Sequence, residues 1–294
     1  MKAIVGTDGS PCAEVAINLA AALPWPDGSL LRVVAAVDPM SLYGPFVGFA
    51  PGVGEFEMSL DQALEEVAKA DALRLRGEGR TTECKVSLGR PSTVLRDEAR
   101  EMGADLIVVG SRGHGSIASM VLGSVSAEVV DHAPCPVLVA RGTRLERILL
   151  AHDGSENAFH AERALRSWPI FKDAHVDVVS VADSAQTWDV MLSAEVGFPP
   201  ERRGALESES QQQHETIAEA ASRRLTAEGH ATETVVPFGD AAHQIIAIAG
   251  QHGADLIVMG TRGNTGLKRL VLGSVARRVL THAHCSVLVV PPEG

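Results

Sequence analysis

The chain has 294 residues, a formal net charge of −11, 45% hydrophobic residues and only 4% aromatic residues. This length is sufficient for two domains, and the aliphatic composition is typical of a parallel sheet covered by helices. The negative charge argues against nucleic acid and anionic membranes as partners, because both are bound through clustered Lys and Arg. A small anion bound by backbone N–H groups is compatible with that charge.

The first half alternates apolar strands with helical segments. Ser10 and Pro11 are expected to start the first helix as its N-cap and first residue, and a Pro-Trp-Pro sequence ends it after residue 23. A Gly/Pro-rich loop at 41–55 is long enough for a lid or a disordered flap. The expected strands are residues 2–8, 30–37, 82–88, 105–110 and 137–140, and further helices are expected around 60–67, from 91 and from 124.

The second half repeats this order after a short charged linker at 141–146. Helices are expected from Ser155, near 205–228 and from Asp240, and a variable loop occupies 184–203. Strands are expected at 147–153, 176–182, 232–238, 255–260 and 287–290. Strands that alternate with helices predict a parallel α/β sheet in each half, with right-handed crossovers.

An internal repeat fixes the domain organisation. Residues 104–139 and 254–289 align without a gap and match at 20 of 36 positions. The matches include a glycine pattern G-x2-G-x9-G-S, and an Asp-Gly-Ser triplet also recurs at 8–10 and 153–155. The chain is therefore predicted to contain two copies of one small domain.

The repeated glycines indicate a nucleotide phosphate site. Each glycine loop follows a buried strand, which is where ligands lie in open α/β sheets, and its last glycine opens a helix. The spacing fits neither a GxxxxGK[ST] phosphate loop nor the dinucleotide pattern GxGxxG. The alternative interpretation is that the glycines only shape turns and that Ser124 caps its helix, but identical spacing in both halves disfavours it.

The charged residues near the glycine loops each have two interpretations. Asp8 and Asp153 either form turns by bonding their own backbone or contact the sugar and base of a nucleotide. Arg112 and Arg262 either reach a phosphate or are solvated. The second loop alone carries Lys268 and Arg269. Their charges either favour binding of a triphosphate or form a solvated helix face, which is the commoner outcome.

Cysteine and histidine spacing predicts neither disulfides nor a metal site. Cys135 and Cys285 occupy equivalent repeat positions and are expected to be small buried apolar residues. His132 and His282 are expected at the C-terminal end of a helix, where a cation suits the dipole. Mg²⁺ is expected only with the phosphates, bound mainly by their oxygens. The cysteine usage, with no secretory signal or membrane-length apolar run, favours a cytoplasmic protein.

These motifs together resemble the universal stress protein family, in its tandem-domain form and its ATP-binding branch. The resemblance covers both halves and implies domains at 1–141 and 146–294, each an open five-stranded parallel sheet of order 3-2-1-4-5 with an adenine-nucleotide α-hydrolase-like fold. It implies ATP at the carboxyl ends of the strands, with Asp8 and Asp153 beside adenine and ribose, and the glycine loops on ribose and phosphates. The candidate nucleotide contacts are Thr7, Asp8, Ala36, Val109, Gly110, Arg112, Gly113, Gly123, Ser124, Val125, His152, Asp153, Val181, Met259, Gly260, Arg262, Gly263, Gly273, Ser274 and Val275.

The sequence does not predict a catalytic residue. No phosphate-loop lysine and no evident base accompany the glycines, so we expect a protein that binds ATP in the stress response and changes assembly or partner binding with it. The alternatives are a slow ATPase or nucleotidyl enzyme that uses the variable loops as lids, and a structural scaffold with degenerate sites. The family resemblance also implies edge-to-edge contacts of the last strands, 137–140 and 287–290, within the chain or in a homodimer.

Overall fold

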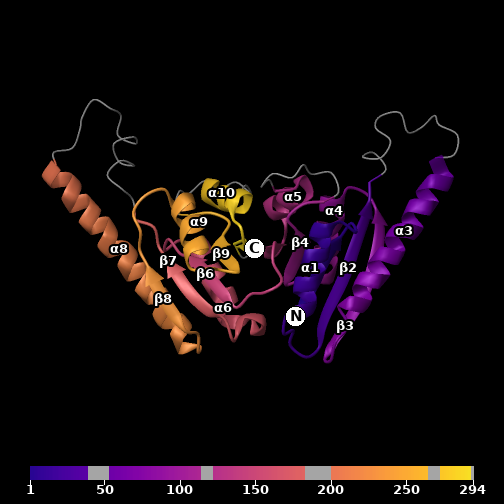
Figure 1. Cartoon of the computed structure of the whole chain (residues 1–294), viewed down its shortest axis with the longest axis horizontal. Coiled ribbons are helices and arrows are strands. Elements are labelled where there is room, and N and C mark those ends of the chain that lie inside the picture. Colours follow the sequence, from indigo (N-terminus) through magenta and orange to yellow (C-terminus); the bar gives the residue numbers. More distant parts are fainter. Residues whose placement is uncertain (39–52, 114–121, 183–199, 264–271, 293–294) are drawn as a thin grey trace. The chain divides into compact units, whose positions relative to one another are not determined.

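The computed structural model of the chain describes residues 1–38, 53–113, 122–182, 200–263 and 272–292. The chain divides into two compact units, and the division falls between Arg144 and Leu145, inside the expected linker (Figure 1). Each unit is a parallel sheet with helices on both faces. Among the described residues, no helix is both long enough and apolar enough to cross a bilayer.

The first unit contains five strands and four helices among its described residues. Its elements are β1 (Lys2–Thr7), α1 (Pro11–Ala22), β2 (Ser29–Val37), α3 (Val53–Arg74), β3 (Arg80–Leu88), α4 (Pro91–Met102), β4 (Leu106–Gly110), α5 (Ser124–His132) and β5 (Val137–Ala140). The second unit repeats them as β6 (Arg147–Ala151), α6 (Glu156–Ser167), β7 (His175–Val179), α8 (Pro200–Ala227), β8 (Thr232–Val235), α9 (Ala241–Gln251), β9 (Leu256–Gly260), α10 (Ser274–His282) and β10 (Ser286–Val290). A 3-10 turn, η2 (Pro169–Phe171), is added after α6.

The strand order confirms the expected topology. The first sheet runs β3-β2-β1-β4-β5 and the second runs β8-β7-β6-β9-β10, which is 3-2-1-4-5 in each unit. All pairs within each unit are parallel, with Val5 opposite Val108 in the first and Leu150 opposite Val258 in the second. The strand order reverses between β1 and β4, and between β6 and β9, so a crevice for a ligand is expected at those strand ends.

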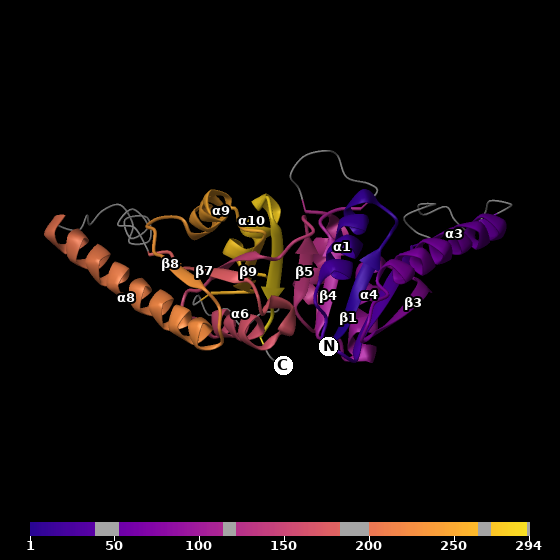
Figure 2. The same ribbon diagram turned by 60° about the horizontal axis from the view of Figure 1, so that its bottom comes forward.

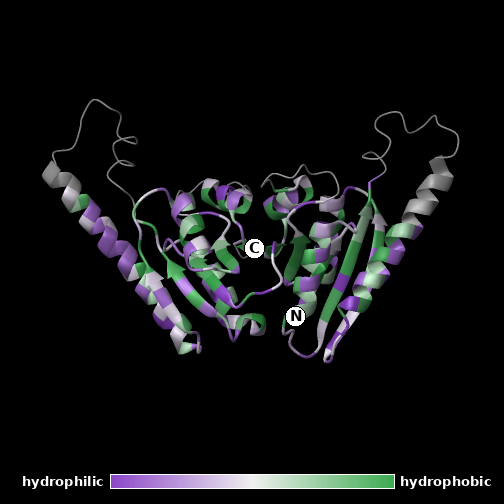
Figure 3. Ribbon diagram, in the orientation of Figure 1, coloured by the Kyte–Doolittle hydropathy of each residue, from purple (hydrophilic) through white to green (hydrophobic). Residues whose placement is uncertain are grey.

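The cores are aliphatic, as the composition predicted. Strands β1, β4, β6 and β9 are apolar and nearly fully buried (Figure 3). The two longest helices, α3 and α8, lie alongside the outer strands β3 and β8 (Figure 2). The described part of α8 is mostly hydrophilic, as expected for the polar helix near 205–228. Aliphatic burial of this extent is the main stabilising contribution to both units.

Helix starts follow the sequence signals. The Ser10 side chain accepts a hydrogen bond from the backbone N–H of Ala13 at 3.2 Å, and Ser155 accepts one from Ala158 at 3.3 Å. Asp240 caps α9 in the same way. The predicted N-cap at Ser10 and the predicted helix starts at Ser155 and Asp240 are therefore confirmed, because capping depends on residues about three positions apart.

Some expected boundaries were wrong. Strand β8 ends at Val235 and not at 238, since Pro237 has no N–H for the sheet ladder. Strand β7 ends at Val179, and beyond it an isolated bridge pairs Ala182 with Phe238. Helix α3 begins at Val53, within the loop expected at 41–55, and α8 begins at Pro200, within the loop expected at 184–203. The remaining parts of those two loops lie outside the described residues.

Candidate functional site

The predicted site lies at the carboxyl ends of the central strands in each unit. Asp8 follows β1, and the glycine loop that starts at Gly110 follows the neighbouring strand β4. Asp153 and Gly260 occupy the same places after β6 and β9. The structure therefore brings both halves of the predicted motif to the point where each strand order reverses.

The first glycine of each loop allows the strand end to approach the first helix. A Cβ atom on Gly110 would overlap the backbone of Cys12 and lie 2.9 Å from the Ala13 nitrogen. On Gly260 it would lie 2.7 Å from the carbonyl carbon of Asn157. Any larger residue would push the strand away from the start of the helix, so glycine is required here for packing.

The second glycine faces the aspartate. A Cβ atom on Gly113 would lie 2.5 Å from Oδ2 of Asp8, and one on Gly263 would overlap Oδ2 of Asp153. The other carboxylate oxygen accepts a backbone hydrogen bond, from Ser10 at 2.9 Å and from Ser155 at 3.0 Å. Each aspartate thus forms a turn through Oδ1, as one sequence interpretation predicted, and faces the glycine loop through Oδ2. Contact with the sugar and base of a nucleotide remains a prediction.

The third glycine closes the loop and starts the helix. The backbone N–H of Gly123 donates to the Ser111 carbonyl at 2.8 Å, and that of Gly273 donates to Thr261 at 2.8 Å. Gly123 and Gly273 are the N-caps of α5 and α10, with no hydrogen bond from a capping side chain. The interpretation in which Ser124 caps its helix is therefore wrong, because Ser124 is the first helical residue.

The start of α5 and of α10 offers donors to a ligand. Ser124 and Ser274 are exposed, and Val125 and Val275 beside them are half-buried. Backbone N–H groups in a first helical turn have no partner inside the helix, and the dipole makes this end favourable for an anion. Residues 114–121 and 264–271, which include Lys268 and Arg269, lie outside the described residues.

The remaining candidate residues line the surroundings of the loop. Val109 and Met259 are buried on β4 and β9, directly before the first glycine. Ala36 on β2 and Val181 after β7 are half-buried. Arg112 and Arg262 are also half-buried. Burial of the valine and methionine leaves mainly backbone atoms of those positions available to a ligand.

Thr7 and His152 precede the two aspartates, and their side chains bond inside the protein. The Thr7 hydroxyl accepts from the Gly9 N–H at 3.3 Å and donates to Oδ2 of Asp71, on α3, at 2.8 Å. The Nδ1 atom of His152 accepts from the Gly154 N–H at 3.2 Å. The side chains therefore hold the backbone turn that carries each aspartate.

In each unit, an acidic side chain lies next to Thr7 or His152 and also contacts an arginine. Arg74 of α3 lies 3.5 Å from Asp71 in the first unit. In the second unit, Arg224 of α8 contacts both carboxylate oxygens of Glu162, at 2.6 Å each. Burial alone would raise the pKa of Glu162, but its hydrogen bonds from Arg224 and the nearby His152 outweigh burial and lower it. The sequence analysis missed these pairs, although Arg74 and Arg224 repeat at the 150-residue spacing of the glycine loops.

Cysteines and histidines do not form a further site in the described parts of the chain. All four cysteines are free thiols there, with Cys135 buried and Cys285 only half-buried. His132 and His282 lie in the last turn of α5 and α10, as expected. No group of three His, Cys, Asp or Glu side chains suited to a metal ion occurs among the described residues.

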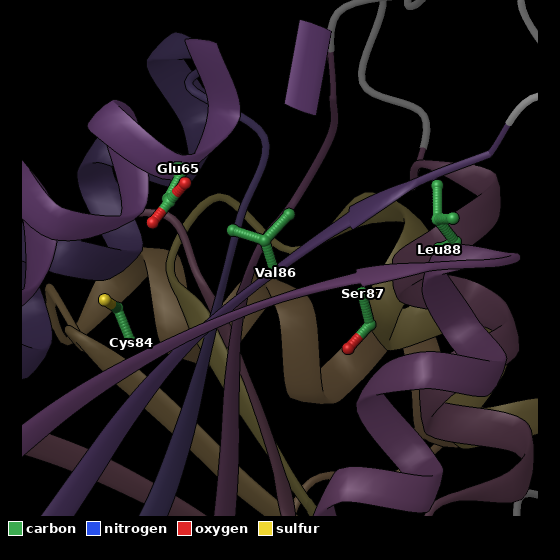
Figure 4. Close-up of a pocket in the computed structure, with 5 residues that line it drawn as sticks. All are labelled: Glu65, Cys84, Val86, Ser87 and Leu88. Atoms are coloured by element: carbon green, nitrogen blue, oxygen red, sulfur yellow. The ribbon is translucent and has the colours of Figure 1, made fainter. Parts of the chain in front are cut away.

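A pocket of about 290 Å³ lies away from these loops, between α3 and the edge strand β3 (Figure 4). Cys84, Val86 and Leu88 alternate along β3 toward the side of Glu65, whereas Ser87 points the other way. The predicted nucleotide contacts do not line this pocket. It belongs to the sheet edge and not to the site at the central strand ends.

Comparisons with known proteins agree with the repeat. The family model described as the universal stress protein family matches residues 1–141 and 144–291. A universal stress protein of Thermus aquaticus, encoded in the QAH/OAS sulfhydrylase 3′ region, is 38% identical over 142 residues, which cover 47% of this chain and 96% of the relative. The universal stress protein Mb2019 of Mycobacterium bovis is 28% identical over 317 residues, which cover 97% of this chain and 93% of the relative.

A solved structure shows the same fold over the full length. The universal stress protein from Archaeoglobus fulgidus superposes with a TM-score of 0.69 at 18% identity, covering 100% of this chain and 98% of that one. The Thermus relative matches one half of the chain, whereas the Mycobacterium relative matches both halves. The chain belongs to the universal stress protein family and carries two copies of the family's domain in tandem.

Proposed function

We propose that each half of the chain binds one molecule of ATP, with Mg²⁺, and that binding controls assembly or partner docking in the stress response. The observation that supports this proposal is the close approach of Gly113 and Gly263 to the carboxylates of Asp8 and Asp153. Both loops retain this arrangement, and a Cβ atom at either glycine would fill the space between loop and acid. If these loops were only turns and bound no ligand, their glycines could have been replaced in one copy and not in the other.

The chemistry of the described residues fits a nucleotide. The Oδ2 atoms of Asp8 and Asp153 are acceptors for sugar or base donors beside the loop. The uncapped first turns of α5 and α10 supply backbone N–H donors for phosphate oxygens. These donors do not depend on net charge, so the charge of −11 is no obstacle. Mg²⁺ would be bound through the phosphates, since the described side chains offer it no cluster of three ligands.

The first experiment is to release and quantify nucleotide from the freshly purified, denatured chain, and to titrate the stripped chain with Mg-ATP by calorimetry. We expect two sites per chain, one after Gly113→Ala or Gly263→Ala, and none in the double variant. The new methyl group meets the movable end of an aspartate side chain, so the fold should persist. Gly250→Ala is the matched control, because its Cβ has open space.

The outcomes separate the alternatives. Absence of bound nucleotide together with no binding of added Mg-ATP would refute the proposal and leave a structural scaffold. ADP release with steady turnover would favour the slow ATPase. Equal stoichiometry in all variants would place the nucleotide elsewhere. Pairing through the last strands is a separate prediction, and sedimentation of the stripped and ATP-loaded chain tests whether a homodimer forms.

A further inference from the structure

The residue before each predicted nucleotide aspartate is polar and buried in both units. Thr7 is 6% exposed and His152 is 2% exposed. Each accepts a hydrogen bond from the backbone N–H two residues further on, at Gly9 or Gly154. That glycine has a positive φ, +72° or +77°, so the turn depends on this local bond and on glycine's freedom. The same hydrogen bond from a glycine N–H is therefore accepted by a hydroxyl in one unit and by an imidazole in the other.

The contact with Gly154 fixes the protonation state of the imidazole. A backbone N–H is only a donor, so Nδ1 of His152 must carry no proton when it lies 3.2 Å from the Gly154 nitrogen. The proton of the neutral ring is then on Nε2. Nε2 lies 3.3 Å from Oε2 of Glu162, off the line of an ideal hydrogen bond. A hydroxyl at Thr7 fills both roles without titrating.

The surroundings of His152 are charged on the Nε2 side. Glu162 of α6 is 2% exposed at its side chain and pairs with Arg224 of α8, while Arg166 of α6 lies 3.8 Å away from it. Phe159 packs edge-to-face on the imidazole at 4.8 Å between ring centroids. The carboxylate beside the ring stays ionised, because its hydrogen bonds to Arg224 outweigh its burial and lower the pKa of Glu162.

The remaining contacts act on the backbone. The Ser180 hydroxyl donates to the His152 carbonyl at 2.6 Å and therefore accepts from Nδ1 of His214, on α8, at 2.8 Å. Asp153 follows directly and bonds the Ser155 N–H through Oδ1. A proton on Nδ1 of His152 would face the Gly154 N–H and break that bond. The turn that presents Asp153 to Gly263 would then lose this hydrogen bond.

We propose that His152 is a positioning residue whose neutral imidazole keeps Asp153 in the binding geometry, so that acid weakens nucleotide binding by the second unit and not by the first. This inference rests on the proposed function. The charged groups that face the ring or its backbone are Glu162, Arg224, Arg166, His214 and Asp153. Histidine is the side chain whose ordinary protonation falls between about pH 5 and pH 8.

The test reads each site separately in the full chain. Gly113→Ala leaves the second site to be measured, and Gly263→Ala leaves the first. Mg-ATP affinity is measured by calorimetry at about pH 8 and about pH 5.5. Loss of one orienting hydrogen bond predicts an affinity about five- to tenfold lower in acid for the second site. Protonation of the nucleotide itself affects both sites, so the first site is the internal control.

Two variants separate positioning from a merely structural role. In His152→Asn the amide oxygen replaces Nδ1 as acceptor but does not titrate, so affinity at about pH 8 should be retained and the extra acid loss should vanish. In His152→Leu the acceptor is missing, so the second site should be about five- to tenfold weaker at both pH values. A pH effect that persists in His152→Asn, or that is equal in the two sites, would overturn the proposal.

Nuclear magnetic resonance of the nucleotide-free chain gives a readout that does not need binding. We expect an unprotonated Nδ1 on His152 at about pH 8, and a shift of the Gly154 amide on acidification that the Gly9 amide does not share. If no nucleotide binds at either pH, the proposed function fails, and these two amides still decide the claim about His152. A Gly154 amide that titrates no more than Gly9 would refute it.

Discussion

Replacement of Arg224 by methionine should destabilise the second unit strongly. The change removes two contacts of 2.6 Å and leaves the Glu162 carboxylate, whose side chain is 2% exposed, without its main partner. Breaking a fully buried ion pair costs about 3–5 kcal/mol. Arg224 is 34% exposed and Arg166 remains 3.8 Å from the acid, so water and a second cation reduce the loss. We therefore expect about 2–3 kcal/mol.

The matched control is Arg74→Met in the first unit. Arg74 lies 3.5 Å from Asp71 and is 40% exposed, so its loss should cost less than about 1 kcal/mol. Methionine retains much of the apolar stem that packs beneath the charge in both cases. Hydrogen exchange read by mass spectrometry reports β1 and β6 separately, which avoids a two-state assumption for a two-domain chain. In calorimetry, the second unit should melt about 5–10 °C lower in Arg224→Met.

The pH dependence of this difference has a definite sign. The pKa of Glu162 is lowered in the folded unit, since its hydrogen bonds from Arg224 and the nearby His152 outweigh the burial that would raise it. A carboxylate with a depressed folded pKa stabilises at neutral pH, and that stability is lost as the pH falls through the folded pKa. The gap between wild type and Arg224→Met should therefore shrink below about pH 4. An equal cost for both arginines, or a gap unchanged in acid, would refute the reasoning.

Three smaller effects follow from single contacts. Gly250→Ala, on an exposed face of α9 with open space for a Cβ, should raise stability by about 0.5–1 kcal/mol in urea unfolding. Asp240→Ala should cost about 1 kcal/mol at neutral pH, because the carboxylate accepts from the His243 N–H at 2.8 Å. That cost should shrink as the pH falls below about 4, because hydrogen bonds from the His243 N–H and from Arg278 outweigh burial and lower the pKa of Asp240. Burial raises the pKa of Cys135 to about 12, so peptide mapping should show iodoacetamide modifying it far more slowly than exposed Cys84 at about pH 8.

Local signals explain how much of the fold the sequence predicts. The N-cap at Ser10 and the helix starts at Ser155 and Asp240 depend on neighbours within a few residues, and they are confirmed. The repeat extends this reasoning to the second unit, where the same strand order is found. The boundary errors at β7 and β8 arise from pairing with a neighbouring strand, which a single segment does not encode. The 3-10 turn at Pro169–Phe171 carries a proline that had not been used as a signal.

The glycine loops and the residues behind them differ in how readily the sequence reveals them. The loops are repeated with fixed spacing, so they could be identified before their contact with Asp8 and Asp153 was seen. Thr7 and His152 were also candidates, but for contact with a nucleotide. The structure places their side chains in polar networks whose partners lie 64 residues away for Thr7 and 10 residues away for His152. No local pattern encodes those partners.

In both units an acid lies beside the residue before the aspartate, but the acid comes from a different helix in each unit. Asp71 of α3 faces Thr7, and the matching position 150 residues later on α8 is alanine at 221. Glu162 of α6 faces His152, and the matching position 145 residues earlier on α1 is isoleucine at 17. In each unit this acid pairs with the equivalent arginine, and in the first unit Arg74 also lies 3.3 Å from Glu14. Removing the arginine would leave the buried acid without its main cation. The turn needs only an acceptor for a glycine N–H, so duplication left its chemistry free to become a hydroxyl in one unit and an imidazole in the other.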